Sequence, residues 1–67
     1  MKLLSNREQE VLQLIAFELT TKEIAGELYI SNHTALTHRK NLIKKLKVKN
    51  TAGVVRRAFE LGYLKVV

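Results

Sequence analysis

Helix-capping signals recur along this chain, and they restrict its possible folds more than any other feature. Ser5-Asn6-Arg7-Glu8 and Thr20-Thr21-Lys22-Glu23 are capping boxes, in which a hydroxyl accepts a first-turn N–H and the glutamate bonds back to the capping residue. Ser31 and Thr51 are further N-cap candidates, each followed by apolar residues at helical spacing. No proline interrupts these segments. The sequence therefore predicts an all-α domain of four helices, arranged in the manner of a four-helix bundle.

The third of these helices is expected over residues 31–46 and the fourth over residues 51–61. Gly62 is the predicted stop of the last helix, since glycine readily takes the left-handed conformation that ends many helices. Nothing predicts a strand. A chain of 67 residues is one small domain, covering residues 1–67. Because Met1 lies so close to the first cap, we expect a fragment of a longer protein rather than a whole one.

Composition excludes several classes of function. There is no cysteine, which rules out disulfides and thiolate–metal sites and fits a reducing compartment. The longest apolar run, Leu14 to Phe17, is far too short for a membrane span. No signal-peptide core precedes the first cap. We therefore expect a cytoplasmic protein with no membrane partner.

Neither a catalytic group nor a metal site is indicated. Glu23 and Glu27 have no paired acid, nucleophile or histidine placed with them for catalysis. His33 and His38 are five residues apart, which is poor ligand spacing on a helix. The sequence predicts that the protein is not an enzyme and holds no cofactor or metal.

Positive charge is concentrated in one half of the chain. Between Leu28 and Phe59 lie eight of the twelve Lys and Arg residues, and no acidic residue. The formal net charge of +6 favours an anionic polymer or surface as the partner.

The predicted third helix divides into an apolar and a polar face on a helical wheel. Ala35, Leu42 and Leu46 fall together and form the seam that is expected to be buried. The opposite side carries hydrogen-bond donors together with one exposed apolar residue, namely His33, Thr37, Lys40 and Lys44, flanked by Leu36 and Asn41. Such groups can contact base edges in the major groove of DNA. A charged helix face is also often simply solvated, and the wheel alone leaves both interpretations open.

The segment before this helix favours a helix-turn-helix. Ala25 is small enough for two helices to cross closely, and Leu28, Ile30 and Ala35 can fill the angle between them. The turn position that often holds glycine is Tyr29 here.

The sequence motifs of this chain resemble those of the LuxR/GerE-type helix-turn-helix domain, over roughly Leu3 to Leu64. The motifs and residues that carry the resemblance are Leu4-Ser5-x-Arg7-Glu8-x-Glu10-Val11-Leu12, Lys22-Glu23-Ile24-Ala25, Leu28-Tyr29-Ile30-Ser31, Thr34, His38, Asn41-Leu42 and Lys45-Leu46-x-Val48. The family typically forms the C-terminal output domain of response regulators and quorum-sensing regulators. The resemblance implies sequence-specific binding of double-stranded DNA and transcription regulation.

The resemblance also implies roles for individual residues. The third helix would be the recognition helix, with Leu36, Thr37 and Lys40 facing the bases, and the wheel adds His33 to this group. Contacts to DNA phosphates would come from Thr20, Lys22, Ser31, Thr34, His38, Asn41 and Lys45, and the wheel adds Lys44 to this group. The fourth helix is the usual dimer surface, and we expect Val54, Val55 and Ala58 to form it. The protein partners that the resemblance implies are a second copy of this chain, in a homodimer on DNA, a receiver or ligand-binding domain, and RNA polymerase.

Departures from the family pattern leave some alternatives open. Glu18 and Lys47 stand where the family commonly has glycine, so either these residues adopt a left-handed conformation or the helix ends differ. Leu36 replaces a residue that is frequently polar, which predicts an unusual target site. Arg56 and Arg57 fit phosphate contacts and a solvated face equally well. A different class of function, docking on an acidic partner domain, also fits the basic block.

Overall fold

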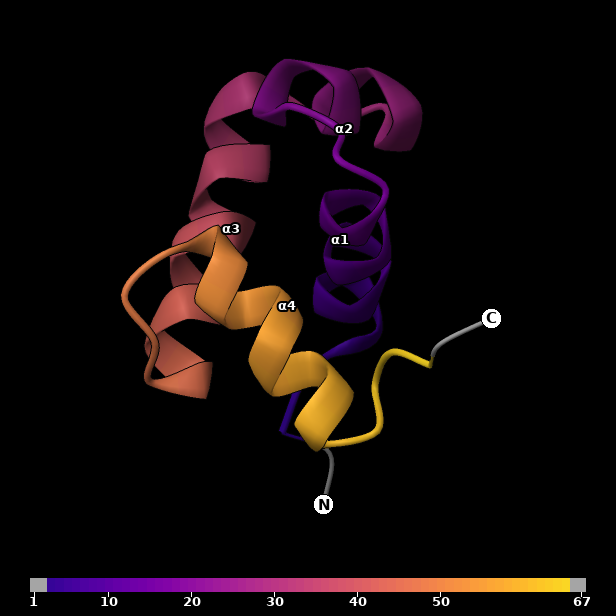
Figure 1. Cartoon of the computed structure of the whole chain (residues 1–67). Coiled ribbons are helices and arrows are strands. Elements are labelled where there is room, and N and C mark those ends of the chain that lie inside the picture. Colours follow the sequence, from indigo (N-terminus) through magenta and orange to yellow (C-terminus); the bar gives the residue numbers. More distant parts are fainter. Residues whose placement is uncertain (1–2, 66–67) are drawn as a thin grey trace.

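Four α-helices account for the regular structure of residues 3–65, which are the residues described by the computed structural model (Figure 1). They are α1 (Asn6–Ala16), α2 (Thr21–Leu28), α3 (Asn32–Leu46) and α4 (Thr51–Glu60). No strand occurs within this range. The prediction of an all-α, four-helix fold is confirmed. The outermost residues of the predicted domain, 1–2 and 66–67, lie outside the described residues.

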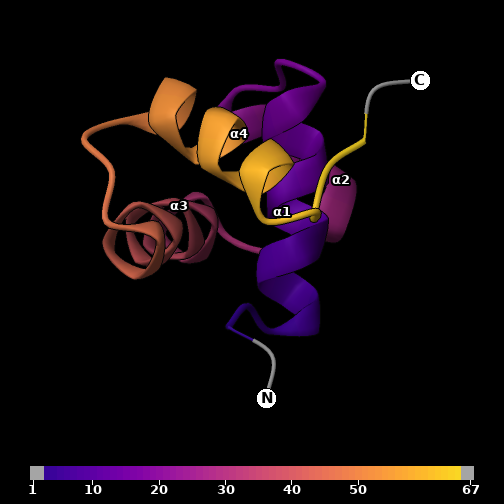
Figure 2. The same cartoon turned by 60° about the horizontal axis from the view of Figure 1, so that its bottom comes forward.

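α3 is the helix around which the others are arranged. It contacts α1, α2 and α4, whereas α2 and α4 do not contact each other. Figure 1 shows α2 lying across one end of the pair formed by α1 and α3. In the turned view of Figure 2, α4 covers one side of that pair, and the far side of α3 remains free. One face of α3 is thus left open to solvent while the rest is held by the scaffold.

The core lies where α1, α3 and α4 meet and extends beneath α2. Its fully buried large side chains are Leu4, Val11, Leu12, Ile24, Leu42 and Val54. Ala25 of α2 (3% exposed) and Ala35 of α3 (0% exposed) are both buried, and the two helices contact each other. Half-buried Leu28 and Ile30 pack against the same core. Small buried residues on two helices that contact each other are consistent with the predicted close crossing.

The helix starts follow the predicted caps, with one exception. The hydroxyls of Ser5, Thr20 and Ser31 accept the N–H three residues on, at 3.1, 3.2 and 3.0 Å. Both predicted capping boxes are complete. The prediction of Thr51 as the cap of α4 was wrong by one residue: the Oδ1 of Asn50 accepts the N–H of Gly53 at 3.0 Å. An asparagine with extended backbone serves this role at least as well as a threonine.

All four helices end in the same way. Each is followed by a residue with left-handed backbone, namely Glu18 (φ 67°), Tyr29 (φ 56°), Lys47 (φ 56°) and Gly62 (φ 84°). The N–H of the next residue then bonds to a carbonyl five residues back, in the pairs Leu19–Leu14, Ile30–Ala25, Val48–Ile43 and Tyr63–Ala58. This is the Schellman ending, which satisfies the last carbonyls of a helix. Glu18 and Lys47 therefore do adopt the left-handed conformation.

The chain after α4 returns to α1. The backbone N–H of Leu4 donates to the Tyr63 hydroxyl at 3.4 Å, and the Gln13 side-chain amide donates to the Tyr63 carbonyl at 3.1 Å. Leu64 is 7% exposed and completes the core at this end. None of the helices in residues 3–65 is both long enough and apolar enough to span a membrane.

Candidate nucleic-acid interface

α3 presents one buried and one exposed face, as the wheel predicted. Ala35 and Leu42 are fully buried, and Leu46 is 3% exposed. The four residues predicted to read bases, His33, Leu36, Thr37 and Lys40, are all exposed. They lie on one side of a single helix whose other side is fixed in the core. We call these four residues the reading face.

The reading face offers both polar and apolar groups. Leu36 is 40% exposed although it is a large apolar side chain, so it is available to contact a ligand such as a thymine methyl group. The Thr37 hydroxyl donates to the His33 carbonyl at 3.0 Å. That bond fixes the Thr37 rotamer and leaves the oxygen able to accept a further hydrogen bond. Lys40 forms no salt bridge within the described part of the chain, so its ammonium keeps all three donors.

The residues predicted to contact phosphates are distributed around this face. Ser31 and Thr34 are exposed at the start of α3, where the Ser31 hydroxyl also donates to the Thr34 hydroxyl at 2.9 Å. Thr20 caps α2, and Lys22 is exposed in its first turn. Along the rest of α3, Asn41, Lys44 and Lys45 are exposed, and His38 is half-buried. All of these side chains except His38 are open to solvent.

Lys45 has a structural partner that the sequence did not show. Its ammonium lies 2.7 Å from the Oε1 of Glu8, a carboxylate that is only 4% exposed. The pair joins α3 to α1. Burial pushes the pKa of the Glu8 carboxyl upward, but the hydrogen bonds from Lys45 and Ser5 outweigh it, so the pKa lies below its ordinary 4.5. The Lys45 side chain is 42% exposed, and its ammonium can still donate to a second oxygen.

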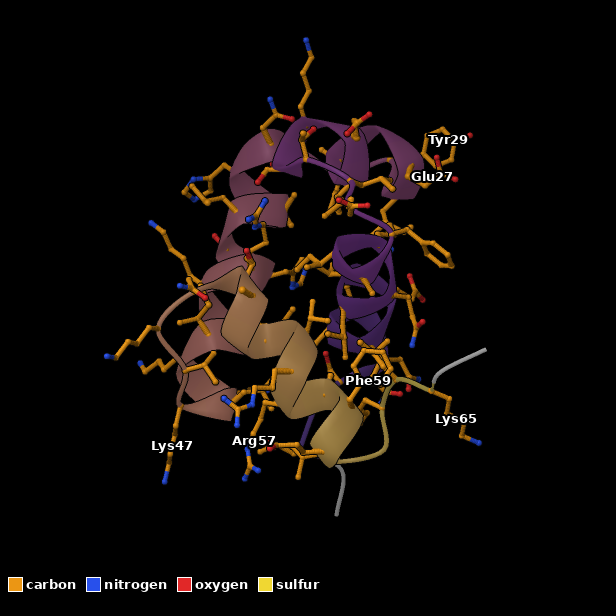
Figure 3. All side chains as sticks on the ribbon, in the orientation of Figure 1. Glu27, Tyr29, Lys47, Arg57, Phe59 and Lys65 are labelled. Atoms are coloured by element: carbon orange, nitrogen blue, oxygen red, sulfur yellow. The ribbon has the colours of Figure 1, made fainter. Side chains whose placement is uncertain are left out.

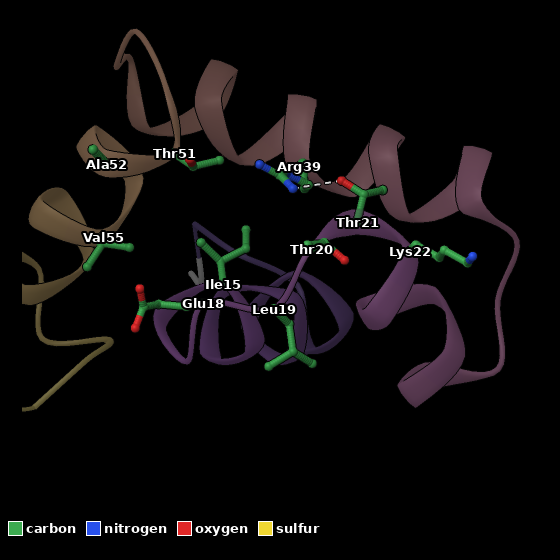
Figure 4. Close-up of a pocket in the computed structure, with 10 residues that line it drawn as sticks. All are labelled: Ile15, Glu18, Leu19, Thr20, Thr21, Lys22, Arg39, Thr51, Ala52 and Val55. Atoms are coloured by element: carbon green, nitrogen blue, oxygen red, sulfur yellow. Dashed lines mark hydrogen bonds between the residues drawn. The ribbon is translucent and has the colours of Figure 1, made fainter.

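Arg39 is a second residue whose role the sequence did not reveal. Its Nη1 donates to the Thr21 hydroxyl at 2.7 Å and ties the middle of α3 to the first turn of α2. Figure 4 shows this bond at the edge of an open hollow of about 740 Å³ between α1, α2, α3 and α4. The helical wheel places Arg39 only on the flank of the apolar seam. It is better described as a residue that positions α3 against α2.

The predicted dimer surface on α4 needs correction. Val54 and Ala58 are 0% exposed, because they face α1 and α3 and belong to the core of this domain. The prediction that they form a surface was therefore wrong. Val55 is half-buried and keeps some exposure. The apolar residues that α4 does present to solvent are Ala52 and Phe59, the latter 43% exposed.

A metal site is not formed by the described residues. Within residues 3–65 no three His, Asp or Glu side chains lie close enough together to hold an ion. His33 is exposed and His38 is half-buried, and nothing pairs them.

Comparison with known proteins decides the family. The model of the family described as "Bacterial regulatory proteins, luxR family" (GerE) matches residues 2–58. The chain belongs to the luxR family. A solved structure described as the transcription factor GerE superposes on this luxR-family domain with a TM-score of 0.91, at 35% sequence identity, covering 97% of each chain. The predicted resemblance and the four-helix fold are both confirmed.

Curated luxR-family relatives include one of similar length and several longer proteins. The spore germination protein GerE of Bacillus subtilis is 42% identical over 64 residues, covering 96% of this chain and 86% of that protein. The uncharacterized response regulatory protein YgeK of Escherichia coli is 48% identical over 59 residues. The transcriptional regulatory protein MctR of Rhizobium johnstonii is 47% identical over 64 residues. The chain spans 40% of YgeK and 30% of MctR.

Family membership establishes the general function of the domain. The luxR family consists of bacterial regulatory proteins, which supports DNA binding and transcription regulation and confirms that the domain is not an enzyme.

Proposed function

We propose that this domain binds a specific double-stranded DNA sequence by placing α3 in the major groove, and thereby regulates transcription. A single observation carries the proposal: the reading face is exposed on a helix whose opposite face is fully buried. A helix held in this way fits the groove, which is about 12 Å wide. Within it, Lys40 would donate to guanine, while Leu36 would contact a thymine methyl group.

The phosphate contacts would fix the orientation of α3 on the duplex. Thr20 and Lys22 lie at the start of α2, and Ser31 and Thr34 lie at the start of α3. Exposed backbone N–H groups at helix starts favour phosphate oxygens. Lys44 and Lys45 would add contacts further along α3. These groups carry no sequence information directly, so specificity rests on the reading face.

Selection of bound duplexes from a random library, followed by gel-shift titration, tests the proposal. On the selected site, log K should fall linearly with log salt, by about 0.9 per phosphate neutralised. Thr37→Ala should change the preference between the selected site and a point-substituted site by about 1–3 kcal/mol. Lys40→Ala should weaken binding to the selected site. If a substitution on the reading face lowered the affinity equally for every DNA sequence, a base-reading role would be contradicted. If micromolar protein bound no duplex at about 100 mM salt, DNA binding would be rejected.

For the assembly on DNA, we propose a homodimer formed through the exposed side of α4. Ala52, Val55 and Phe59 follow at spacings of three and four residues and so form one stripe. A two-fold arrangement would read two half-sites about one helical turn apart. Sedimentation of the protein with a palindromic duplex checks this, and Phe59→Arg should reduce a 2:1 complex to 1:1. A wild-type complex that stays 1:1 at saturation rejects the dimer.

Protein partners are a further part of the proposal. YgeK is named a response regulatory protein, and this supports a receiver or ligand-binding domain as a partner of this module. RNA polymerase is proposed as a second partner on the sequence resemblance alone. Docking on an acidic partner is the competing function. NMR chemical shifts of the labelled domain, followed during titration with an isolated receiver domain, test both the receiver-domain partner and the competing docking function. Shifts confined to the reading face in the absence of any duplex binding would favour the competing function.

A further inference from the structure

A second hollow lies at the end of α3 that is farther from α2. It is a shallow depression of about 370 Å³ in the loop before α4 and along α4 itself. Its lining residues are Val48, Lys49, Asn50, Gly53, Arg56, Arg57 and Glu60. None of these residues belongs to the reading face. For Arg56 and Arg57 the sequence left a phosphate contact and a solvated face equally open, and the other lining residues have no role in the function described so far.

Positive charge dominates this hollow. It contains three cations, Lys49, Arg56 and Arg57, which we call the cation cluster. The only carboxylate that lines it is Glu60, at 3.2 Å from Arg57 and 3.9 Å from Arg56. One glutamate shared between two arginines leaves a positive excess and restrains the guanidinium groups. Lys49 has no salt-bridge partner within residues 3–65. An anionic ligand is the chemical complement of such a surface.

The position of the cluster relative to α3 identifies the anion. α3 has 15 residues and so is about 22 Å long, whereas the major groove is about 12 Å wide. A helix that enters the groove at an angle, with its N-terminal turns against the bases, therefore has its C-terminal end near the bordering phosphates. In Figure 3, Lys47 and Arg57 both extend from this end of the domain, opposite α2. Ser31 and Thr34, which are predicted phosphate contacts, lie at the opposite, N-terminal end of α3.

We propose that the cation cluster is a second DNA-phosphate site, which holds the backbone at the C-terminal end of α3. Ser31 and Thr34, at the start of α3, would hold the backbone at the other end, so that the duplex is gripped on both sides of the reading face. The sugar–phosphate backbone has the same charge in every sequence, so the cluster contributes affinity without base preference. This inference rests on the proposed DNA binding.

Neutralising the cluster while preserving the fold tests the proposal. Lys49→Gln and the double variant Lys49→Gln/Arg56→Gln leave the Arg57–Glu60 pair intact. Arg56 has 84% of its side chain exposed, so its replacement removes little packing. The slope of log K against log salt should become shallower by about 0.9 for each phosphate that the variant no longer neutralises. Affinity for the selected site and for a random duplex should fall by the same factor. Ethylation interference on the selected site should lose the phosphates that the cluster binds.

Lys65→Gln provides the matched control. Lys65 is an exposed lysine on the other side of the domain (Figure 3), and its loss changes the net charge by the same amount as Lys49→Gln. The control should keep the wild-type slope. A double variant with the wild-type slope and affinity would overturn the proposal while leaving DNA binding by α3 intact. If the wild-type domain binds no duplex, the proposed DNA-binding function and the proposed phosphate site are both rejected.

Discussion

At the scale of single residues, Glu8 combines two tasks that the sequence shows only in part. Its Oε1 accepts the Ser5 N–H at 2.8 Å, which completes the capping box of α1, and also pairs with Lys45. The capping box follows from three-residue spacing and is visible in the sequence. The pairing with Lys45 joins residues 37 positions apart, and no local pattern specifies such a contact.

We expect Glu8→Gln to lower the free energy of unfolding by about 1–2 kcal/mol near pH 7. A glutamine can still complete the capping box, so the loss measures the pair with Lys45. The folded-state pKa of Glu8 is depressed, so its contribution is present above the unfolded-state pKa and is lost as pH falls through the folded-state value. Urea unfolding of both proteins from pH 7 downward gives the measurement. The difference between them should shrink below about pH 4.5, and one that is constant down to pH 2 would contradict this account.

Two glycines in helices should respond to alanine in opposite ways. A Cβ on Gly53 would lie 2.8 Å from the Val48 Cβ, and because that atom is part of a stiff β-branched residue, α4 must shift. A Cβ on Gly26 meets nothing within 4 Å. We expect Gly53→Ala to lower the free energy of unfolding by about 1–3 kcal/mol. Gly26→Ala should raise it by up to about 1 kcal/mol through helix propensity. Thermal unfolding compares the two, and a destabilised Gly26→Ala would contradict the open space seen there.

At the scale of elements, the helix ends show what makes the chain turn. Each left-handed residue is followed by an apolar side chain, Leu19, Ile30, Val48 or Tyr63, which packs against the core. The Schellman ending and this hydrophobic contact support each other. Only Gly62 has the residue type that such an ending favours. The apolar residue after each turn therefore determines where the helix stops, at some cost in backbone strain.

Tyr29→Gly should stabilise the fold, since it relieves that strain. Tyr29 has φ 56° and is 96% exposed, so glycine removes no core packing. We expect a gain of about 0.5–1 kcal/mol, because the relief of left-handed strain exceeds the added entropy of the unfolded chain. Gly62→Ala is the reverse change at φ 84° and should destabilise. Urea unfolding of both variants checks the pair. Destabilised Tyr29→Gly would mean that the tyrosine ring contributes packing.

The sequence predicts helix starts better than helix surroundings. Caps and periodicity are local, so three of four caps, the buried seam of α3 and its exposed face could be predicted. The environment of α4 could not be predicted in the same way, since Val54 and Ala58 look equally suited to a core or to an interface. Only the packing of α4 on α1 and α3 assigns them to the core. The Arg39–Thr21 bond depends on how α2 and α3 cross, so it could not be predicted from the sequence either.

At the scale of the whole molecule, charge is segregated between the two halves of the sequence. The block from Leu28 to Phe59 has no internal carboxylate. Within residues 3–65 its ion pairs use Glu8 and Glu60, which lie outside it. Most of its cations therefore repel one another in the free domain. The same repulsion is relieved when an anionic polymer binds.

The stability of the free domain should therefore increase with salt. Raising NaCl from about 20 to about 200 mM shortens the screening length and weakens this repulsion, so Tm should rise. Duplex binding should show the opposite trend and weaken over the same range. Calorimetry on the domain with and without the selected duplex measures both. A free-domain Tm that falls with added salt would show that attractive ion pairs outweigh the repulsion.

The turn between α2 and α3 has a consequence for how target sites change during evolution. It consists of Tyr29, Ile30 and Ser31, and the outer two have structural tasks: Tyr29 is left-handed, and Ser31 caps α3. Ile30 bonds back to Ala25, so no residue of the turn is free to act as a hinge. We therefore expect related domains to acquire new operators by exchanging side chains on α3 rather than by changing the tilt of the helix.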